Sequence, residues 1–534
     1  MARSPKDWIL PTVSLVALLV SAVAILAVGE ADHTPMGGHK RPKGQGEKRQ
    51  REKAHLSHLP PHAARRPGRG VGGRVGGRVS GGSSRGRSAA NSRGRTGGLL
   101  PPVVKPSKSR LILRRPPLKR FLPQLRAVER KTLAAKMRRR TRRYPYVAVA
   151  TGYRAKVYAN TRGKGSAVSF IRRGVILPIK TRVTGTGCED GNWYKEGGTG
   201  YVCTSKGFDV GPRKRPPSSD YTAPDLHRAE PYDYAKVVDD EAFRYYRPPT
   251  KKQVEATQEA AFNDERLPSI AVRQLEGDFF LAWGKEFKKD GRTYVRSPRG
   301  TYIAKDALER FPRREMHGEV LGRRVRLPLA FVYKERVPVY RIKAGEAEVT
   351  GLAQKHSRFF VKRTLKTATR RWVLDGGGHA VRRRDVRICR SRRQPKNLRG
   401  VDRWIHVDLS EQTLVAYRGQ RPVFATLVST GVPGHSTPLG LYRITHKHIT
   451  TTMQGPDDEV GWYDVGEVPW TLYYRKLYAI HGAYWHENFG KRQSHGCTNV
   501  APADAKWLFH WTRPRRPVGW HSVRDEGTHV WFTE

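Results

Sequence analysis

The chain has 534 residues, enough for three or four domains of about 150 residues each. It holds 102 Lys and Arg against 47 Asp and Glu, a formal net charge of +55. This balance excludes an ordinary neutral cytosolic enzyme and predicts a polyanionic neighbour: nucleic acid, anionic lipid or an acidic wall polymer. The charge is unevenly spread, because residues 31–150 hold 32 Lys/Arg and 4 Asp/Glu, whereas residues 401–534 hold 14 and 13. The last quarter is therefore charge-balanced, as a folded catalytic domain is.

The amino terminus, residues 1–30, predicts a membrane anchor. Residues 8–28 form an uncharged stretch that follows Arg3 and Lys6, and as a helix it spans about 30 Å, the thickness of a bilayer core. A cleaved signal peptide is the alternative, with Ala27-Val28-Gly29 as its small-residue site, although signal cores are usually shorter. We favour the uncleaved anchor. Both interpretations place the rest of the chain in the cell envelope, outside the cytoplasmic membrane and thus periplasmic.

Residues 31–143 predict a basic low-complexity tether. The stretch 61–100 is rich in Gly and Arg and has no acidic residue, so it cannot bury enough apolar surface to offset its conformational entropy. Its repeat VGGRVGGRVSGG is similar to Arg-Gly segments that bind RNA, but outside the membrane we favour a charged spacer and expect no nucleic acid. The expected partner is an anionic envelope polymer or lipid. Residues 124–143 predict either a basic helix on anionic lipid or a solvated charge run.

Residues 144–210 predict a small β-barrel. Short β-branched and aromatic runs alternate with Gly turns, as in VAVATGYRAKVYA, VILPIK and NWYKEGGTGYVC. The last run resembles the bacterial Src-homology-3-like domains that accompany wall enzymes, through Trp193, Tyr194, Gly200 and Tyr201. That resemblance implies binding of peptidoglycan stem peptides by the aromatic side chains, and core packing of the same rings is the alternative.

The four cysteines, Cys188, Cys203, Cys389 and Cys497, match neither a small disulfide scaffold nor a zinc pattern. Cys188 and Cys203 are close enough in sequence to pair in an oxidising compartment, while Cys389 has no obvious partner.

Residues 211–400 predict a linker followed by a second β-rich module whose task the sequence does not disclose. The pattern of residues 251–263 is helical, and residues 268–390 return to strands and turns. Residues 339–340 and 371–381 hint at another barrel.

Residues 401–534 carry the chemistry. Residues 404–409, 413–417, 424–430 and 441–445 predict strands, and residues 502–511 a short helix that begins at Pro502. Between them lies the constellation IHG, residues 480–482, followed by SHGCTN, residues 494–499. A cysteine beside histidines in an exported chain is a candidate nucleophile, because an imidazole can take the thiol proton. Gly496 permits a tight bend whose backbone N–H groups can stabilise an oxyanion.

The combination of HG, SHGC-x-N and an upstream TPLG-x-Y resembles the L,D-transpeptidase family of peptidoglycan enzymes. The resemblance implies a β-sandwich catalytic domain with a mobile flap, here residues 445–470, so that the whole chain is expected to be mainly β with a membrane helix and barrel modules upstream. The roles it implies are a nucleophile, Cys497; a base, His481, oriented by the carbonyl of Gly482; an oxyanion pocket at His495, Gly496 and Cys497; and substrate contacts by Asn499, Ser494, Tyr484 and Trp485. For the two aromatic residues, core packing is the alternative.

The resemblance further implies two acyl transfers on peptidoglycan stem peptides. The thiol attacks the amide after the third stem residue and releases the terminal D-Ala, and a side-chain amine of a second stem then forms a 3→3 cross-link. Water as acceptor would make an L,D-carboxypeptidase, and a lipoprotein lysine would make a protein anchor. A non-catalytic peptidoglycan-binding scaffold is the remaining alternative. We expect no cofactor, and His446 and His448, which alternate as on a strand, lack a third metal ligand.

Overall fold

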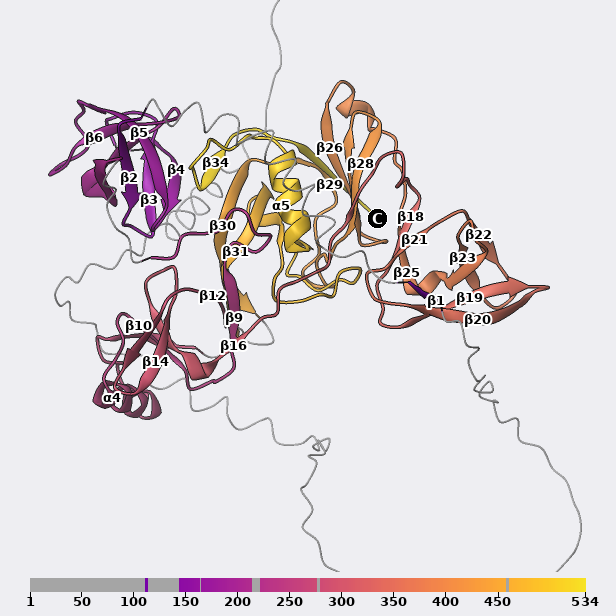
Figure 1. Ribbon diagram of the computed structural model, residues 1–534, viewed down its shortest axis with the longest axis horizontal. Coiled ribbons are helices and arrows are strands. Elements are labelled where there is room, and N and C mark those ends of the chain that lie inside the picture. Colours follow the sequence, from indigo (N-terminus) through magenta and orange to yellow (C-terminus); the bar gives the residue numbers. More distant parts are fainter. Residues whose placement is uncertain (1–110, 114–143, 164, 214–220, 276–278, 458–460) are drawn as a thin grey trace, which may run out of the picture. The chain divides into compact units, whose positions relative to one another are not determined.

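The computed structural model describes residues 111–113, 144–163, 165–213, 221–275, 279–457 and 461–534 (Figure 1). All of them belong to the compact unit Pro101–Glu534. The predicted anchor, the Arg-Gly stretch and the predicted basic helix at 124–143 lie outside the described residues. Within the described part of the chain, no helix is both long and apolar enough to cross a bilayer.

Residues 144–213 form a seven-stranded antiparallel sheet, and the small barrel expected over residues 144–210 stays a prediction. The strand order is β4-β3-β7-β6-β5-β2-β8. Trp193 is buried and packs edge-on against Tyr158 at 5.2 Å, which favours core packing for this ring. A disulfide joins Cys188 and Cys203. The strands are β2 Tyr146–Ala150, β3 Arg154–Tyr158, β4 Ala167–Arg172, β5 Ile176–Val183, β6 Trp193–Glu196, β7 Tyr201–Cys203 and β8 Phe208–Pro212.

The segment from residue 221 to 310 contains a five-stranded sheet, ordered β11-β10-β15-β14-β13, and a helix. The helix α4, Lys251–Phe262, lies where the sequence predicts it. It begins with a capping box in which the Thr250 hydroxyl accepts from the Gln253 N–H at 3.3 Å and the Gln253 amide oxygen accepts from the Thr250 N–H at 3.0 Å. The strands are β9 Asp233–Val237, β10 Phe243–Tyr245, β11 Ala271–Gln274, β12 Phe279–Trp283, β13 Glu286–Lys289, β14 Arg292–Arg296, β15 Tyr302–Ala304 and β16 Leu308–Arg310.

Residues 319–389 add two further sheets, ordered β1-β20-β19-β24-β23-β22 and β21-β18-β25. Strand β1, Leu111–Leu113, comes from the predicted tether and pairs in parallel with β20, so this short part of the tether is a strand. The other strands are β17 Glu319–Val320, β18 Leu329–Val332, β19 Val337–Lys343, β20 Glu346–Ala353, β21 Arg358–Phe360, β22 Arg363–Lys366, β23 Arg371–Leu374, β24 His379–Arg382 and β25 Val386–Cys389.

The carboxy-terminal part is built from two sheets and one helix. One sheet has the order β17-β28-β27-β26-β35-β29; in the other, β34, β30, β31, β32 and β33 follow one another. Both sheets and helix α5 contribute to one apolar core, which includes Ile405, Leu472, Ile480, Leu508 and Phe532. The elements are β26 Arg403–Asp408, β27 Thr413–Arg418, β28 Arg421–Leu427, β29 Gly440–Arg443, β30 His446–Asp457, β31 Gly461–Arg475, β32 Tyr478–Gly482, β33 Thr498–Val500, α5 Pro502–Trp511, β34 Ser522–Arg524 and β35 His529–Thr533.

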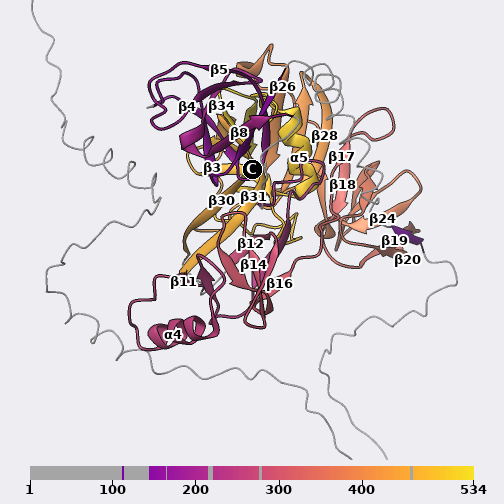
Figure 2. The same ribbon diagram turned by 60° about the vertical axis from the view of Figure 1, so that its left-hand side comes forward.

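Both sheets of the carboxy-terminal part extend into the segment before residue 401. Strand β12 pairs in parallel with β31, with Phe279 opposite Asp464, and β9 and β16 continue the same sheet. Both views place β12 beside β31 (Figures 1 and 2). Strand β17 pairs with β28, with Glu319 opposite Ala425. Strands from both sides of the predicted boundary at residue 401 therefore belong to the same sheets. Local sequence patterns do not reveal this pairing.

Candidate active site

Cys497 lies in a tight bend immediately before β33. The preceding Gly496 has φ +107°, and a Cβ there would come within 2.6 Å of the Tyr478 ring. Only glycine fits this position without strain, as the sequence predicts. The thiol Sγ is 3.6 Å from the Leu477 carbonyl oxygen, and Cys497 is partly exposed. The bend therefore presents a thiol at the end of a strand.

Two hydroxyl groups hold the bend in shape. The Ser494 hydroxyl donates to the Cys497 carbonyl oxygen at 2.5 Å and accepts from the Gly496 N–H at 3.2 Å. The Thr437 hydroxyl donates to the Gly496 carbonyl oxygen at 2.8 Å and accepts from the Gly431 N–H at 2.9 Å. Ser494 thus braces the bend, and its expected contact with substrate stays a prediction. The expected oxyanion pocket at His495, Gly496 and Cys497 likewise stays a prediction.

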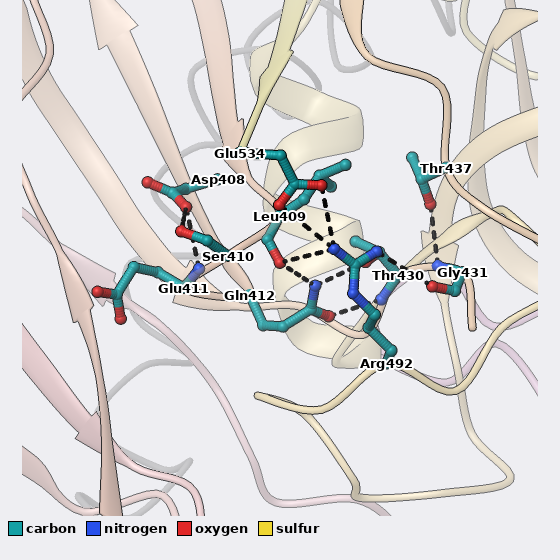
Figure 3. A network of polar contacts seen from close by, with 10 residues as sticks. All are labelled: Asp408, Leu409, Ser410, Glu411, Gln412, Thr430, Gly431, Thr437, Arg492 and Glu534. Carbon is teal, nitrogen blue, oxygen red and sulfur yellow. Dashed lines mark hydrogen bonds and ion pairs between the residues drawn. The ribbon is translucent and has the colours of Figure 1, made fainter. Parts of the chain in front are cut away.

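A polar network of Gln412 and Arg492 joins the β26–β27 turn to Thr430 and Gly431 (Figure 3). The Gln412 side chain joins the β26–β27 turn to Thr430, because its amide nitrogen donates to the Leu409 oxygen at 2.7 Å and its amide oxygen accepts from the Thr430 N–H at 2.9 Å. The Thr430 carbonyl oxygen in turn accepts from the Ser494 N–H at 3.1 Å. Arg492 donates to the Gly431 oxygen at 3.3 Å (Figure 3). The bend is therefore anchored to the sheet that contains β26, β27 and β28.

His481 lies in β32, and Cys497 directly precedes the neighbouring strand β33. Strands β32 and β33 run in parallel with His481 opposite Asn499, so these two side chains share one face of the second sheet. The Cys497 thiol has a backbone hydrogen bond with Ala479, two residues before His481. The predicted nucleophile thus lies beside the strand that carries the predicted base.

The His481 ring is oriented by its own strand. Its Nδ1 is 3.4 Å from the Gly482 carbonyl oxygen, which can only accept, so Nδ1 carries the hydrogen and Nε2 is left as the acceptor. Gly482 itself is tightly packed: a Cβ there would come within 3.0 Å of Pro469 and 3.1 Å of Pro502. The predicted orienting role of the Gly482 carbonyl agrees with this geometry.

The resting pair is neutral. Burial lowers the pKa of His481 to about 4, against a raising effect of the Gly482 hydrogen bond. Burial also raises the pKa of the Cys497 thiol to about 11, against a lowering backbone hydrogen bond from Ala479. At neutral pH the imidazole is therefore free of a second proton and can receive the one that the thiol loses.

His486 is a further buried histidine next to Asn499. It is buried, its Nε2 lies 2.9 Å from the Asn499 amide nitrogen, and its Nδ1 accepts from the Asn488 N–H at 3.2 Å. Burial lowers its pKa to about 3. A neutral ring that accepts at Nδ1 carries its hydrogen on Nε2, and an amide nitrogen cannot accept it, so the Asn499 amide turns its oxygen towards His486. His486 and Asn499 are therefore hydrogen-bond partners, and a substrate contact by Asn499 stays a prediction.

Trp485 and Tyr484, the two aromatic residues predicted near the substrate, lie in different surroundings. Trp485 is half-buried and stacks on the His481 ring, with centroids 5.7 Å apart. Tyr484 is buried, its ring stacks on Tyr234 at 3.7 Å, and its hydroxyl donates to the Gly466 oxygen at 2.8 Å. Tyr484 therefore packs in the core, which was the alternative for both residues, while Trp485 lies against the imidazole of the predicted base.

The predicted flap is the hairpin of β30 and β31. Its Tyr463 stacks on His495 with centroids 5.3 Å apart and planes 8° apart. His495 is exposed and also contacts His435 edge-on at 5.0 Å. Sequence patterns missed Tyr463, because nothing local indicates which hairpin residue reaches the bend.

Other titratable candidates lie elsewhere. Cys389 is buried 3.9 Å from the Thr426 oxygen, and burial raises the pKa of its thiol. His448 packs between the rings of Phe170 and Tyr473. Among the described residues, no three His, Cys, Asp or Glu side chains form a metal-binding group.

A partly exposed thiol in a glycine bend, with a neutral imidazole on the neighbouring strand, is typical of sites for nucleophilic acyl transfer. Residues 402–519 match the YkuD family model, the L,D-transpeptidase catalytic domain. The predicted resemblance is thereby confirmed for this part of the chain. No curated protein matches the chain.

Several solved structures are similar over a limited region. The Ldtfm-avibactam carbamoyl enzyme is 26% identical over 25% of this chain and 49% of that chain, with a TM-score of 0.21. L,D-transpeptidase 3 from Mycobacterium tuberculosis is 19% identical over 25% of this chain and 61% of that one, with a TM-score of 0.22. The catalytic domain of the E. faecium L,D-transpeptidase is 25% identical over 25% of this chain and 97% of that one, with a TM-score of 0.21. The chain spans about half the length of the first of these.

Proposed function

We propose that the protein is an L,D-transpeptidase that forms 3→3 peptidoglycan cross-links through a thioester on Cys497. The observation that carries the proposal is the pairing of β32 with β33, which sets His481 on the strand next to the thiol bend, with the His481 Nδ1 turned to the Gly482 carbonyl. This arrangement leaves the imidazole Nε2 as the acceptor for the thiol proton. It lies within the region that matches the L,D-transpeptidase catalytic domain.

In the first transfer, the Cys497 sulfur attacks the amide carbon that follows the third stem residue. The thiol proton passes to His481, because the neutral pair holds no thiolate at rest. Backbone N–H groups of the bend stabilise the developing oxyanion. His481 then returns the proton to the leaving D-Ala amine as the C–N bond breaks, and a thioester remains.

In the second transfer, the side-chain amine of another stem attacks the thioester carbon. His481 takes the amine proton and returns it to the departing sulfur, which leaves the cross-link and the free thiol. Water in place of the amine gives an L,D-carboxypeptidase, and a lipoprotein lysine gives a protein anchor. These three acceptors share one acyl-enzyme, so the same site serves each of them.

We further propose that the chain works in the cell envelope and contributes to cell-wall organisation and cell shape. The N-terminal apolar segment anchors it, the basic tether holds it against anionic polymer or lipid, and the sheet at residues 144–213 serves as a Src-homology-3-like wall module. Support comes from the sequence of these segments and from the disulfide between Cys188 and Cys203, which suits an oxidising compartment. Deleting residues 33–143 should leave turnover of soluble peptide almost intact and weaken association with anionic vesicles.

The test is incubation of the full chain with a tetrapeptide stem, with and without an amine acceptor stem. We expect release of D-Ala and, with the acceptor, a 3→3 dimer identified by mass. Hydrolysed stem without dimer would identify the carboxypeptidase. No release by protein with a native circular dichroism spectrum would refute the enzyme and favour the scaffold.

A further inference from the structure

Two buried carboxylates on strand β31 are held by arginines from outside the matched catalytic region. Asp464 is 2% exposed. Arg244 approaches its Oδ2 at 3.3 Å, and Arg299 donates to both oxygens, to Oδ2 at 3.2 Å and to Oδ1 at 3.3 Å. Arg299 therefore forms a two-pronged pair, the geometry in which a guanidinium binds a carboxylate most specifically.

The second carboxylate, Glu467, is also 2% exposed. Arg172 places its Nε 3.3 Å from Oε2, and the hydroxyls of Tyr153 and Thr450 donate to the two carboxylate oxygens. The Glu467 backbone oxygen accepts from the Tyr234 hydroxyl at 2.9 Å. Glu467 also has φ +53°, a left-handed conformation that a non-glycine residue adopts only when its surroundings hold it there.

Apart from Thr450 of β30, the side chains that contact the two carboxylates come from two segments upstream of residue 402. Arg172 and Tyr153 belong to the seven-stranded sheet, whereas Arg244 and Arg299 belong to the segment that contains α4. A buried carboxylate is stable only if it is paired and hydrogen-bonded. Strand β31 therefore keeps its observed conformation only while both upstream segments supply their cations.

The clamped stretch, residues 463–467, contacts residues that lie close in sequence to both members of the catalytic pair. Tyr463, next to Asp464, stacks on His495 of the thiol bend at 5.3 Å. The oxygen of Gly466, next to Glu467, accepts from the Tyr484 hydroxyl at 2.8 Å. Tyr484 follows His481 by three residues. A shift of this stretch would thus change the packing next to the thiol bend and next to His481.

We propose that Asp464 and Glu467 are positioning residues through which the upstream modules hold the β30–β31 hairpin over the thiol bend. The catalytic unit then extends from about residue 150 to the carboxyl end, and the upstream modules set the reactivity of Cys497 as well as any location in the wall. The activity readout rests on the proposed function; the structural readout does not.

The experiment compares Asp464→Asn and Glu467→Gln in the full chain with the control Asp306→Asn. Asp306 pairs with Arg292 on the same upstream segment as Arg299, but the pair is exposed. Tyr153→Phe is the milder variant, because it removes only the hydroxyl and keeps the ring that Arg172 covers at 4.2 Å. Hydrogen exchange of residues 463–467 and 494–498 is followed by mass spectrometry, and acylation by a carbapenem is timed by intact mass.

We expect exchange in both stretches to rise, and acylation to slow, by about tenfold or more in the two carboxylate variants, with a smaller change in Tyr153→Phe. The control and the exchange of β26 and β27 should stay at the wild-type level. Wild-type exchange and acylation in the Asn, Gln and Phe variants would overturn the proposal. If local exchange rises in the carboxylate variants but the wild-type protein itself is not acylated, the proposed function is refuted and the clamp stands.

Discussion

Replacing Ser494 with Ala removes both hydrogen bonds that the hydroxyl makes inside the bend. The groups left behind are the Cys497 carbonyl and the Gly496 N–H. Each lost bond costs about 1 kcal/mol net, and about 1–3 kcal/mol where the remaining partner stays buried without a substitute. The bend should thus lose about 2–4 kcal/mol of preference for its observed shape.

If about 2 kcal/mol of that loss enters the barrier to acylation, the rate falls about 30-fold. The assay is the rate of carbapenem adduct formation by intact mass, measured together with Tm. The control is Ser410→Ala, since the Ser410 hydroxyl donates to Asp408 at 2.7 Å and not to the bend, and Ser494→Thr should retain part of the rate. Acylation of the Ser494→Ala protein within threefold of wild type would refute the reasoning.

Four further results are expected. Gly496→Ala should lower acylation by about 100-fold or more, because φ +107° and a 2.6 Å approach to Tyr478 exclude a Cβ; near wild-type acylation would contradict the bend geometry. The acylation rate should be flat with pH between the pKa of His481, about 4, and that of Cys497, about 11, and a limb near pH 6–8 would contradict the neutral pair. Cys389→Ala should acylate at the wild-type rate, because its thiol is buried away from the bend. The free energy of unfolding, measured with urea, should fall by about 3 kcal/mol for His481 alone as the pH drops from 6.5 towards 4. The reason is that the unfolded state binds a proton at this histidine in a pH range where the folded state does not. A free energy of unfolding that does not decline would contradict the buried neutral ring.

Local features of the fold could be predicted well. Helix α5 begins at Pro502 and ends at Trp511, and β26 and β27 pair across the polar turn, because caps, turns and alternation act over a few residues. Pairing across long sequence separations could not be predicted. Strand β12 joins β31 although about 180 residues separate them, and no alternation pattern specifies a partner so far along the chain.

The candidate site also has features that the sequence predicts and features that only the structure reveals. Cys497, His481 and Gly496 could be found from residue type and spacing, and the structure brings them together. The hydrogen bonds of Ser494 inside the bend and the stacking of Tyr484 on Tyr234 could not be predicted, because the partner of such a side chain depends on tertiary contacts. The buried carboxylates of β31 lie in the stretch GWYDVGEVPW, residues 461–470, and nothing in this local sequence specifies their distant arginines, which only the structure reveals.

The central claim is that Cys497 is the nucleophile, and the site of a covalent adduct tests it most directly. The full chain is exposed to a carbapenem and its intact mass is measured beside Cys497→Ala and Cys389→Ala. We predict one adduct on the wild-type and Cys389→Ala proteins, mapped to the peptide that contains residues 494–499, and none on Cys497→Ala. An adduct that persists on a folded Cys497→Ala protein, or that maps to Cys389, would contradict the account.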